Sequence, residues 1–325
     1  TFEIVYVPSI DFLMSAWIPR GIAFRMQSFT FYVAVALYLL FKEREWIVYT
    51  RDNVVTRASM FGFNVVYECQ HIFAGTKRLL TGSRRVHKVV VISNALKQAF
   101  LEHGYSDEDV LVGPSGVDLS VFDSSITRDE ARSDLDLPHD KTIVLYTGNF
   151  KTMGEEKGIA HCIEALQYTS KEVVFVASGG TDQYCREYQE LAEKVGAQKR
   201  VIFRGYQSQS AFAKYQKAAD MLVMPFPDTP HYRNHMSPIK MFEYMASKRP
   251  IIATDLPTIR EVLSEKNAVI VPPDDPRALA TSFDVVGESL DVYYERALRA
   301  FEDVQEYTWD VRAQNVIKSL STISP

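Results

Sequence analysis

Short apolar runs alternate with helical patterns along the second half of the chain. Several of these runs are apolar at consecutive positions, which is typical of parallel strands covered on both faces of a sheet. The runs are 142–148, 172–180, 200–206, 220–226, 250–255 and 267–273. Helical patterns separate them at 182–195, 208–219, 238–248, 257–264 and 276–286, and another follows Gly158. This alternation predicts a parallel, Rossmann-like α/β domain.

The first part of the chain has fewer apolar runs but the same kind of pattern. Strands are predicted at 45–52, 64–70, 88–93 and 109–116, and a helix at 94–104. The segment 118–141 is polar and rich in turn residues, which indicates a boundary. We therefore expect two α/β domains that face each other, residues 1–122 and 123–305. Ligands of open parallel sheets bind beyond the carboxyl ends of the strands, so the predicted site is the cleft between the domains.

The longest apolar run is FTFYVAVALYLLF, residues 29–41. Its thirteen residues are too few to span a bilayer, which takes about 20. We therefore expect no transmembrane helix. Packing of this segment in a core is the favoured interpretation, and contact with a membrane surface is the alternative.

Composition and charge restrict the class of protein. A chain of 325 residues with 46% hydrophobic and 24% charged residues is globular and long enough for two domains with cores of their own. The net charge of −5 argues against a nucleic-acid-binding protein. Three cysteines without metal-binding spacing, and no signal peptide pattern, predict a reducing compartment and therefore the cytoplasm.

The charge is unevenly distributed. Residues 1–88 hold 11 Lys and Arg against 6 Asp and Glu, whereas the remainder holds 25 against 35. A basic cluster lies at 77–88. It is either a solvated surface or a contact for an anionic acceptor or an anionic membrane leaflet. The second interpretation adds peripheral binding to the cytoplasmic face of the membrane.

Three of the loops that follow strands could hold a ligand. Lys151 and Lys157 lie near a helix start in the loop 149–158, an arrangement that suits a diphosphate or leaves two solvated lysines. Gly179 begins a glycine pair that allows either close approach of a ligand or a tight turn. Tyr206 could flank a planar base or simply lie in a turn.

The segment 237–243 raises a question about its carboxylate. Ser237 is a good N-cap and Pro238 suits the first helical position, so the next amides would form an anion site. Ile239 and Phe242 belong to the expected buried stripe, which Glu243 borders. A carboxylate there needs donors. A vicinal diol such as a ribose would supply two, and an ion pair with Lys240, three residues earlier, is the alternative.

His231 and His235 are spaced four apart, as in some zinc sites. Pro230 precedes them, Tyr232 stands where a metalloprotease would have glutamate, and no third ligand is evident from the sequence. We expect no metal site and no cofactor.

Taken in order, these segments resemble a known family. The segments are IVYTRD, VVYECQH, VVVISNALKQAF, VGPSGVDLSVF, LYTGNF…EKG and SPIKMFEYMASKRPIIATDLPTIREV. They are similar to retaining GT-B glycosyltransferases of family four, whose second half is called the glycosyl transferases group 1 domain. The resemblance implies two Rossmann-like domains, with a C-terminal helix at 306–325 that packs back on the first domain. It also implies hexosyl transfer from a UDP- or GDP-linked sugar, without a metal, in polysaccharide or glycoconjugate biosynthesis.

The resemblance assigns roles to residues. Glu243 would hold the ribose hydroxyls, the amides of Ile239 and Lys240 would meet the diphosphate, and Lys157 would reach the phosphates. The whole donor-binding set is expected to be Asn149, Lys151, Gly179, Tyr206, Ser237, Pro238, Ile239, Lys240 and Glu243. The catalytic residues are expected to be His71 and Lys157, and the acceptor-side residues Arg51 and Gln70. The acceptor would be a glycan, a lipid-linked sugar or a small molecule.

The sequence departs from the family pattern at several positions. Asn149 stands in place of the usual arginine, and His235 in place of a second carboxylate. Either Gln70 or His71 takes the place of a first-domain histidine, with His71 favoured. The strand, glycine-rich loop and helix that open the first domain are not recognisable, and the chain starts at what resembles the third strand. A non-catalytic nucleotide-sugar-binding subunit and a GT-B epimerase or phosphorylase are therefore the alternatives.

Overall fold

The computed structural model describes two compact units. Unit 1 consists of Thr1–Val91, Leu96–Val112 and Val316–Pro325, and unit 2 of Ile92–Ala95 and Gly113–Asn315. The described residues are 11–12, 14, 17–43, 45–72, 76, 86–122, 125–152 and 154–320. Most of the basic cluster, 77–85, and the strand predicted at 1–8 lie outside them. The boundary expected after residue 122 falls inside unit 2.

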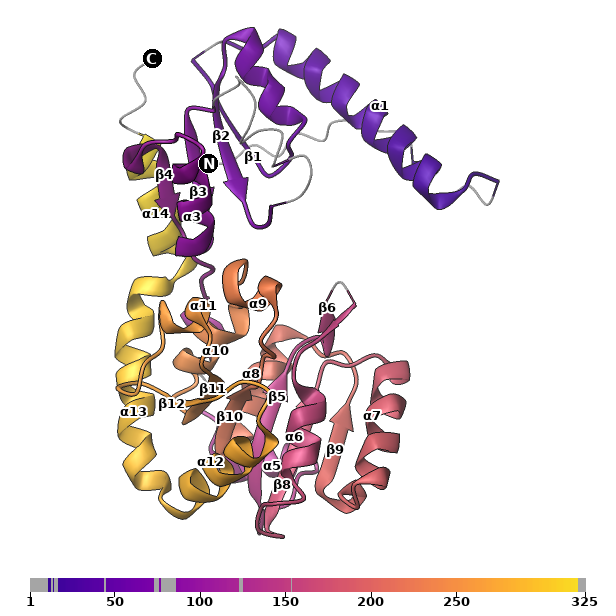
Figure 1. The fold of residues 1–325 in the computed structure, drawn as a ribbon, viewed down its shortest axis with the longest axis vertical. Coiled ribbons are helices and arrows are strands. Elements are labelled where there is room, and N and C mark those ends of the chain that lie inside the picture. Colours follow the sequence, from indigo (N-terminus) through magenta and orange to yellow (C-terminus); the bar gives the residue numbers. More distant parts are fainter. Residues whose placement is uncertain are drawn as a thin grey trace. The chain divides into compact units, whose positions relative to one another are not determined.

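Unit 1 is built on a parallel sheet of four strands (Figure 1). The strands are β1 (Ile47–Thr50), β2 (Asn64–Cys69), β3 (Lys88–Val91) and β4 (Val110–Val112), in the order β1-β2-β3-β4. The helices of this unit are α1 (Arg20–Leu40), η1 (Val55–Phe61), α3 (Asn94–Glu102) and η2 (Asp107–Asp109). Val316, near the end of α14 (Trp309–Leu320), packs against Val66 and Val90 of the sheet. The last helix therefore adds a few residues to this core.

Helix α1 differs from its prediction in length and in burial. It has 21 residues, because the helix starts at Arg20 and includes Gln27 and Ser28, which precede the apolar run. Ala23 is its one buried side chain, and Phe24 and Phe29 are 64% and 68% exposed. The expected core packing is therefore wrong for this helix. By length and composition it is also a helix that could cross a membrane, so the argument from thirteen apolar residues does not hold.

Unit 2 is a doubly wound parallel sheet of six strands, and all six predicted strands form (Figure 1). They are β5 (Thr142–Thr147), β8 (Val173–Ser178), β9 (Val201–Arg204), β10 (Met221–Met224), β11 (Ile251–Thr254) and β12 (Val269–Val271). Their order is β12-β11-β10-β5-β8-β9. A short hairpin, β6 (Lys151–Thr152) with β7 (Glu155–Glu156), follows β5.

Helices cover both faces of this sheet. They are α4 (Leu119–Phe122), α5 (Arg128–Asp134), α6 (Ile159–Ala165), α7 (Asp182–Lys194), α8 (Gln209–Ala218), α9 (Pro230–Asn234), α10 (Ile239–Ala246), α11 (Pro257–Arg260), α12 (Pro276–Glu288) and α13 (Leu290–Asp303). Successive residues of β5 enter different cores: Leu145 packs with α5, α8 and α10, whereas Val144 packs with α6, α7 and α12. This alternation explains why the strands are apolar at consecutive positions.

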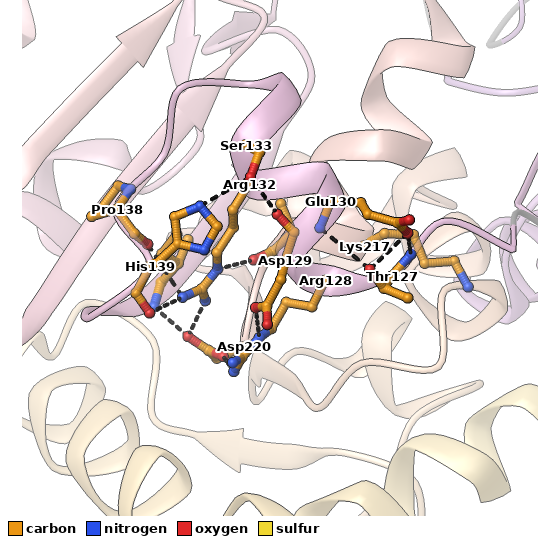
Figure 2. A network of polar contacts seen from close by, with 12 residues as sticks. Thr127, Arg128, Asp129, Glu130, Arg132, Ser133, Pro138, His139, Lys217 and Asp220 are labelled. Carbon is orange, nitrogen blue, oxygen red and sulfur yellow. Dashed lines mark hydrogen bonds and ion pairs between the residues drawn. The ribbon is translucent and has the colours of Figure 1, made fainter.

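A buried ion pair fastens the segment that looked like a domain boundary to unit 2 (Figure 2). Arg132 of α5 is 1% exposed, and its guanidinium lies 2.6 Å from Asp220 Oδ2. It also donates to the backbone carbonyls of Ala218, Pro138, His139 and Lys141. Asp220 in turn accepts from the amide of Ile143, at 2.7 Å, and from Arg128. The polar composition of 118–141 thus reflects a structural network, and not a linker.

Candidate functional site

The predicted donor-binding residues follow the carboxyl ends of strands in unit 2. Asn149 and Lys151 follow β5, Gly179 follows β8, Tyr206 follows β9, and the segment 237–243 comes after β10. Because parallel strands end at the same edge of a sheet, these loops belong to one end of unit 2. This is the place where open α/β sheets bind ligands.

Two glycines bring the loops after β5 and β8 into backbone contact. A Cβ on Gly179 would lie 2.7 Å from the carbonyl carbon and oxygen of Gly148. Both glycines have positive φ, +115° and +105°, which disfavours other residues. The Gly179 amide also donates to the carbonyls of Arg204 and Gly205. Gly148 and Gly179 therefore allow the close packing of neighbouring loops.

Helix α10 begins without a side-chain cap. Its first residue is Ile239 and its N-cap is Pro238, so the prediction that Ser237 caps the helix is wrong. The Ser237 hydroxyl instead accepts a hydrogen bond from the Ser115 amide, at 2.8 Å. Since the first amides of a helix have no acceptor within it, those of Ile239 and Lys240 form an anion-binding end.

The buried surface of α10 is wider than the predicted stripe. Residues 240–246 are all buried, whereas Ile239 is 46% exposed. Ile239 was therefore wrongly placed in the core, and Glu243 lies inside the buried surface and not at its border. Other elements of unit 2 cover most of the surface of α10. The periodic pattern of apolar residues along a single helix cannot indicate such covering.

Glu243 has one hydrogen-bond donor among the described residues. It is 7% exposed, and its Oε1 accepts from Gln209 Nε2 at 3.1 Å. Burial raises the pKa of this carboxyl above its ordinary value, and the Gln209 bond and the charge of Lys240 offset part of that effect. A carboxylate can accept about four hydrogen bonds. The geometry therefore leaves acceptor capacity for a further donor such as a hydroxyl.

The ion pair considered for Glu243 is absent from the described residues, where Lys240 Nζ has no hydrogen-bond partner. This ammonium lies 3.3 Å from the centre of the Tyr146 ring and is buried with the rest of the side chain. Burial and the charge of Lys157 hold the pKa of Lys240 well below its ordinary value. Burial also lowers the pKa of Lys157. Two amino groups are thus held in a desolvated region beside the start of α10.

The loop that carries Lys151 and Lys157 is organised by carboxylates of the protein. Lys151 pairs with Glu187 at 2.9 Å and lies 4.6 Å from the Tyr184 ring centre. Glu156 accepts from the amides of Gly158 and Ala160 at the start of α6. Glu156 therefore takes up two of the amides at this helix start, and a contact of Lys151 or Lys157 with a diphosphate stays a prediction.

The remaining two residues of the donor set lie at the surface. The Asn149 side chain is exposed, and its backbone carbonyl accepts from the Tyr146 hydroxyl at 2.9 Å. Tyr206 is 82% exposed. Tyr206 is therefore accessible to a planar base, and its contact with one stays a prediction.

The residues predicted for the acceptor side gather around one carboxylate in unit 1. Glu68 of β2 is 2% exposed and accepts from Arg51 at 2.8 Å, from Gln70 at 3.1 Å and from the Tyr49 hydroxyl. The His71 carbonyl accepts from Cys69 Sγ and Thr76 Oγ1. Sequence analysis missed Glu68, although a charged residue within the apolar strand VVYEC was a usable signal.

Comparison with known proteins identifies the class. The chain aligns with a glycosyltransferase from Rickettsia africae over 90% of its length and 81% of that chain, with a TM-score of 0.75 and 18% identity. It aligns with Anabaena HepE in complex with UDP over 92% of its length and 84% of that chain, with a TM-score of 0.75 and 18% identity. The fold is that of the GT-B glycosyltransferases. Residues 141–286, somewhat less than half of the chain, match the family model of the glycosyl transferases group 1, which is the family that the motifs resemble.

Curated relatives agree with this assignment. An uncharacterized glycosyltransferase of Methanocaldococcus jannaschii is 25% identical over 71% of this chain and 58% of its own length. A phosphatidyl-myo-inositol mannosyltransferase of Mycolicibacterium smegmatis is 26% identical over 66% of this chain and 53% of its own length. The chain spans about half the length of the curated relatives it matches.

Proposed function

We propose that the protein is a retaining glycosyltransferase that moves a hexosyl group from a nucleotide-sugar to an acceptor, without a metal. The observation that carries the proposal is Glu243, a buried carboxylate to which one described residue, Gln209, donates, beside the uncapped start of α10. A ribose diol supplies the missing donors, and the attached diphosphate meets the first amides of the helix.

The chemistry follows from this arrangement. The diphosphate leaves with developing negative charge, which Lys157 and the amides of Ile239 and Lys240 stabilise electrostatically. The acceptor attacks on the face from which the diphosphate departs, so retention needs no protein nucleophile. His71 is the proposed first-domain catalytic residue, and Arg51 and Gln70 are the proposed acceptor contacts.

A nucleoside diphosphate is expected to stabilise the fold. At a hundredfold excess over its dissociation constant, the matching nucleotide should add about 2.7 kcal/mol to the free energy of unfolding. A thermal-shift panel of UDP, GDP and ADP tests this, with Glu243→Ala as the site variant and Glu193→Ala on exposed α7 as the control. Loss of a hydrogen bond to a charged group weakens binding about 10- to 100-fold, so the stabilisation at the same nucleotide concentration should fall to about 0.4–1.4 kcal/mol in Glu243→Ala and stay unchanged in the control. No response of the wild type to any nucleotide contradicts the proposed function.

Product analysis separates transfer from its alternatives. A transferase forms a new glycoside only when an acceptor is supplied. An epimerase converts the nucleotide-sugar without acceptor, a phosphorylase requires phosphate, and a binding subunit leaves the donor unchanged.

We also propose that the protein acts in the cytoplasm, peripherally on the anionic cytoplasmic membrane face, with a lipid-linked acceptor. Helix α1 supports this, because it exposes Phe24 and Phe29 and carries Arg20 and Arg25 without acidic residues. Aromatic side chains and cations on one exposed helix suit an anionic interface. The mannosyltransferase relative is named for phosphatidyl-myo-inositol, which is a lipid.

Liposome co-sedimentation is expected to report this contact. Binding should require anionic lipid and weaken with salt. The double variant Phe24→Ser, Phe29→Ser should bind at least about a hundredfold more weakly, since each buried Phe contributes about 1.5–3 kcal/mol. Val292→Ser, at an exposed apolar position of α13, is the control. Equal sedimentation of the double variant and the control contradicts the proposal.

A further inference from the structure

Lys240 places an unpartnered ammonium beside the carboxyl end of the central strand β5. The side chain is 8% exposed, and Nζ has no hydrogen-bond partner among the described residues. Nζ and Cε both lie 3.5 Å from the position that a Cβ on Gly148 would take. A buried polar group without a partner is costly, so this ammonium indicates a ligand with complementary charge.

The groups around Lys240 do not supply that charge. Tyr146 of β5 presents its ring to Nζ at 3.3 Å, and Phe226, after β10, lies at 5.6 Å. Lys157, before α6, opposes the charge of Lys240, whereas Glu243 on α10 and Cys162 on α6 favour it. Glu243 already accepts from Gln209, and Cys162 is buried with its pKa raised well above the ordinary value, so its thiol is neutral.

We propose that the Lys240 ammonium is a second cation for the donor diphosphate, beside Lys157 and the first amides of α10. This inference rests on the proposed function and adds a residue and a linkage to it. The diphosphate carries the two or three negative charges that two desolvated amino groups require. In this proposal the ammonium of Lys240 binds the diphosphate, and the backbone amide of the same residue is one of the first amides of α10.

Proton uptake on binding is the consequence. In the free protein, burial and the charge of Lys157 hold the pKa of Lys240 well below its ordinary value. A bound diphosphate raises that pKa, because opposite charge favours the protonated form. A group with a higher pKa in the bound state strengthens binding at low pH and loses this effect as pH rises through the bound pKa. Affinity for UDP is therefore expected to fall as pH rises above neutrality, where the phosphates are already ionised.

Calorimetry in two buffers of different ionisation enthalpy measures the uptake directly. We expect wild-type protein to take up protons when it binds UDP at pH 8. Lys157 also has a lowered pKa, so Lys240→Met should reduce the uptake and not abolish it. Binding of UDP by the wild type without proton uptake and without pH dependence overturns the role of Lys240, and this measurement does not depend on any variant folding.

Comparing the affinities of variants for UDP and UMP tests whether Lys240 contacts the second phosphate. Lys240→Met should weaken UDP binding about 10- to 100-fold, the range for a charge-assisted contact, and should weaken UMP binding much less. Lys171→Met, at an exposed position before β8, is the matched control and should bind both as the wild type does. Equal losses for UDP and UMP, or no loss for UDP, overturn the inference. If the wild type binds no nucleoside diphosphate at all, both this inference and the proposed function are wrong.

Discussion

Replacing Arg132 with methionine is expected to lower the free energy of unfolding of unit 2 by about 3–5 kcal/mol. Methionine keeps the buried volume but removes the guanidinium that pairs with Asp220 at 2.6 Å. It also leaves four backbone carbonyls without this donor. The Asp220 carboxylate would remain buried with the Ile143 amide and Arg128 as its donors. Urea unfolding monitored by fluorescence or circular dichroism measures the loss.

An exposed arginine provides the matched comparison. Arg186 lies on the surface of α7, and Arg186→Met should change stability by no more than about 0.5 kcal/mol. If Arg132→Met costs as little as Arg186→Met, the network of Figure 2 does not hold α5 against the sheet.

Replacing Gly158 with alanine is expected to cost about 2–5 kcal/mol and to displace the loop that carries Lys157. The added Cβ would lie 1.7 Å from the carbonyl oxygen of Pro225, which is backbone and cannot turn aside. Gly158 also has φ +85°, where an L side chain costs about 1–2 kcal/mol by itself. The rest of the loss is the clash, which costs about 1–3 kcal/mol in a packed region. Unfolding curves give the total, and nucleotide affinity reports the displaced loop.

Gly196 separates the two causes. It follows α7 with φ +70°, and a Cβ there would meet nothing within 4 Å. Gly196→Ala should therefore lower the free energy of unfolding only by the cost of the positive φ, about 1–2 kcal/mol, and leave nucleotide binding unchanged. Similar losses from both variants would mean that the contact between Gly158 and Pro225 relaxes without cost.

The strands of unit 2 could be predicted because both faces of the sheet are buried, so that consecutive residues of each strand are apolar. Val144 and Leu145 enter different cores, so neither position tolerates a polar side chain. The resemblance to the family then predicted which loops at the strand ends hold the donor. The last long helix before the C-terminal segment, α13, was missed, because its sequence is strongly polar on one side and Ala297 and Ala300 are its buried residues.

Contacts between distant parts of the chain could not be predicted from local pattern. Gln209 and Glu243 are 34 residues apart, and neither sequence environment indicates the other. Arg132 looked like a linker residue because its acceptors come from the turn 138–141 and from the end of α8. Lys240 was expected to contribute its amide, with an ion pair to Glu243 as the alternative for its side chain. Its burial could not be predicted, because it depends on the elements packed around it.

Strand β1 gives unit 1 an open side. Among the described strands it pairs with β2 alone, and Ile47 and Tyr49 are 40% and 41% exposed. Its sequence, Ile47–Thr50, contains neither proline nor a charged residue, the features that normally keep a sheet edge from recruiting another chain. An edge with this composition is of the kind that can pair with a strand of a second molecule. The solubility of the purified protein is therefore expected to depend on these four residues, which lie far along the chain from the loops of the proposed donor site.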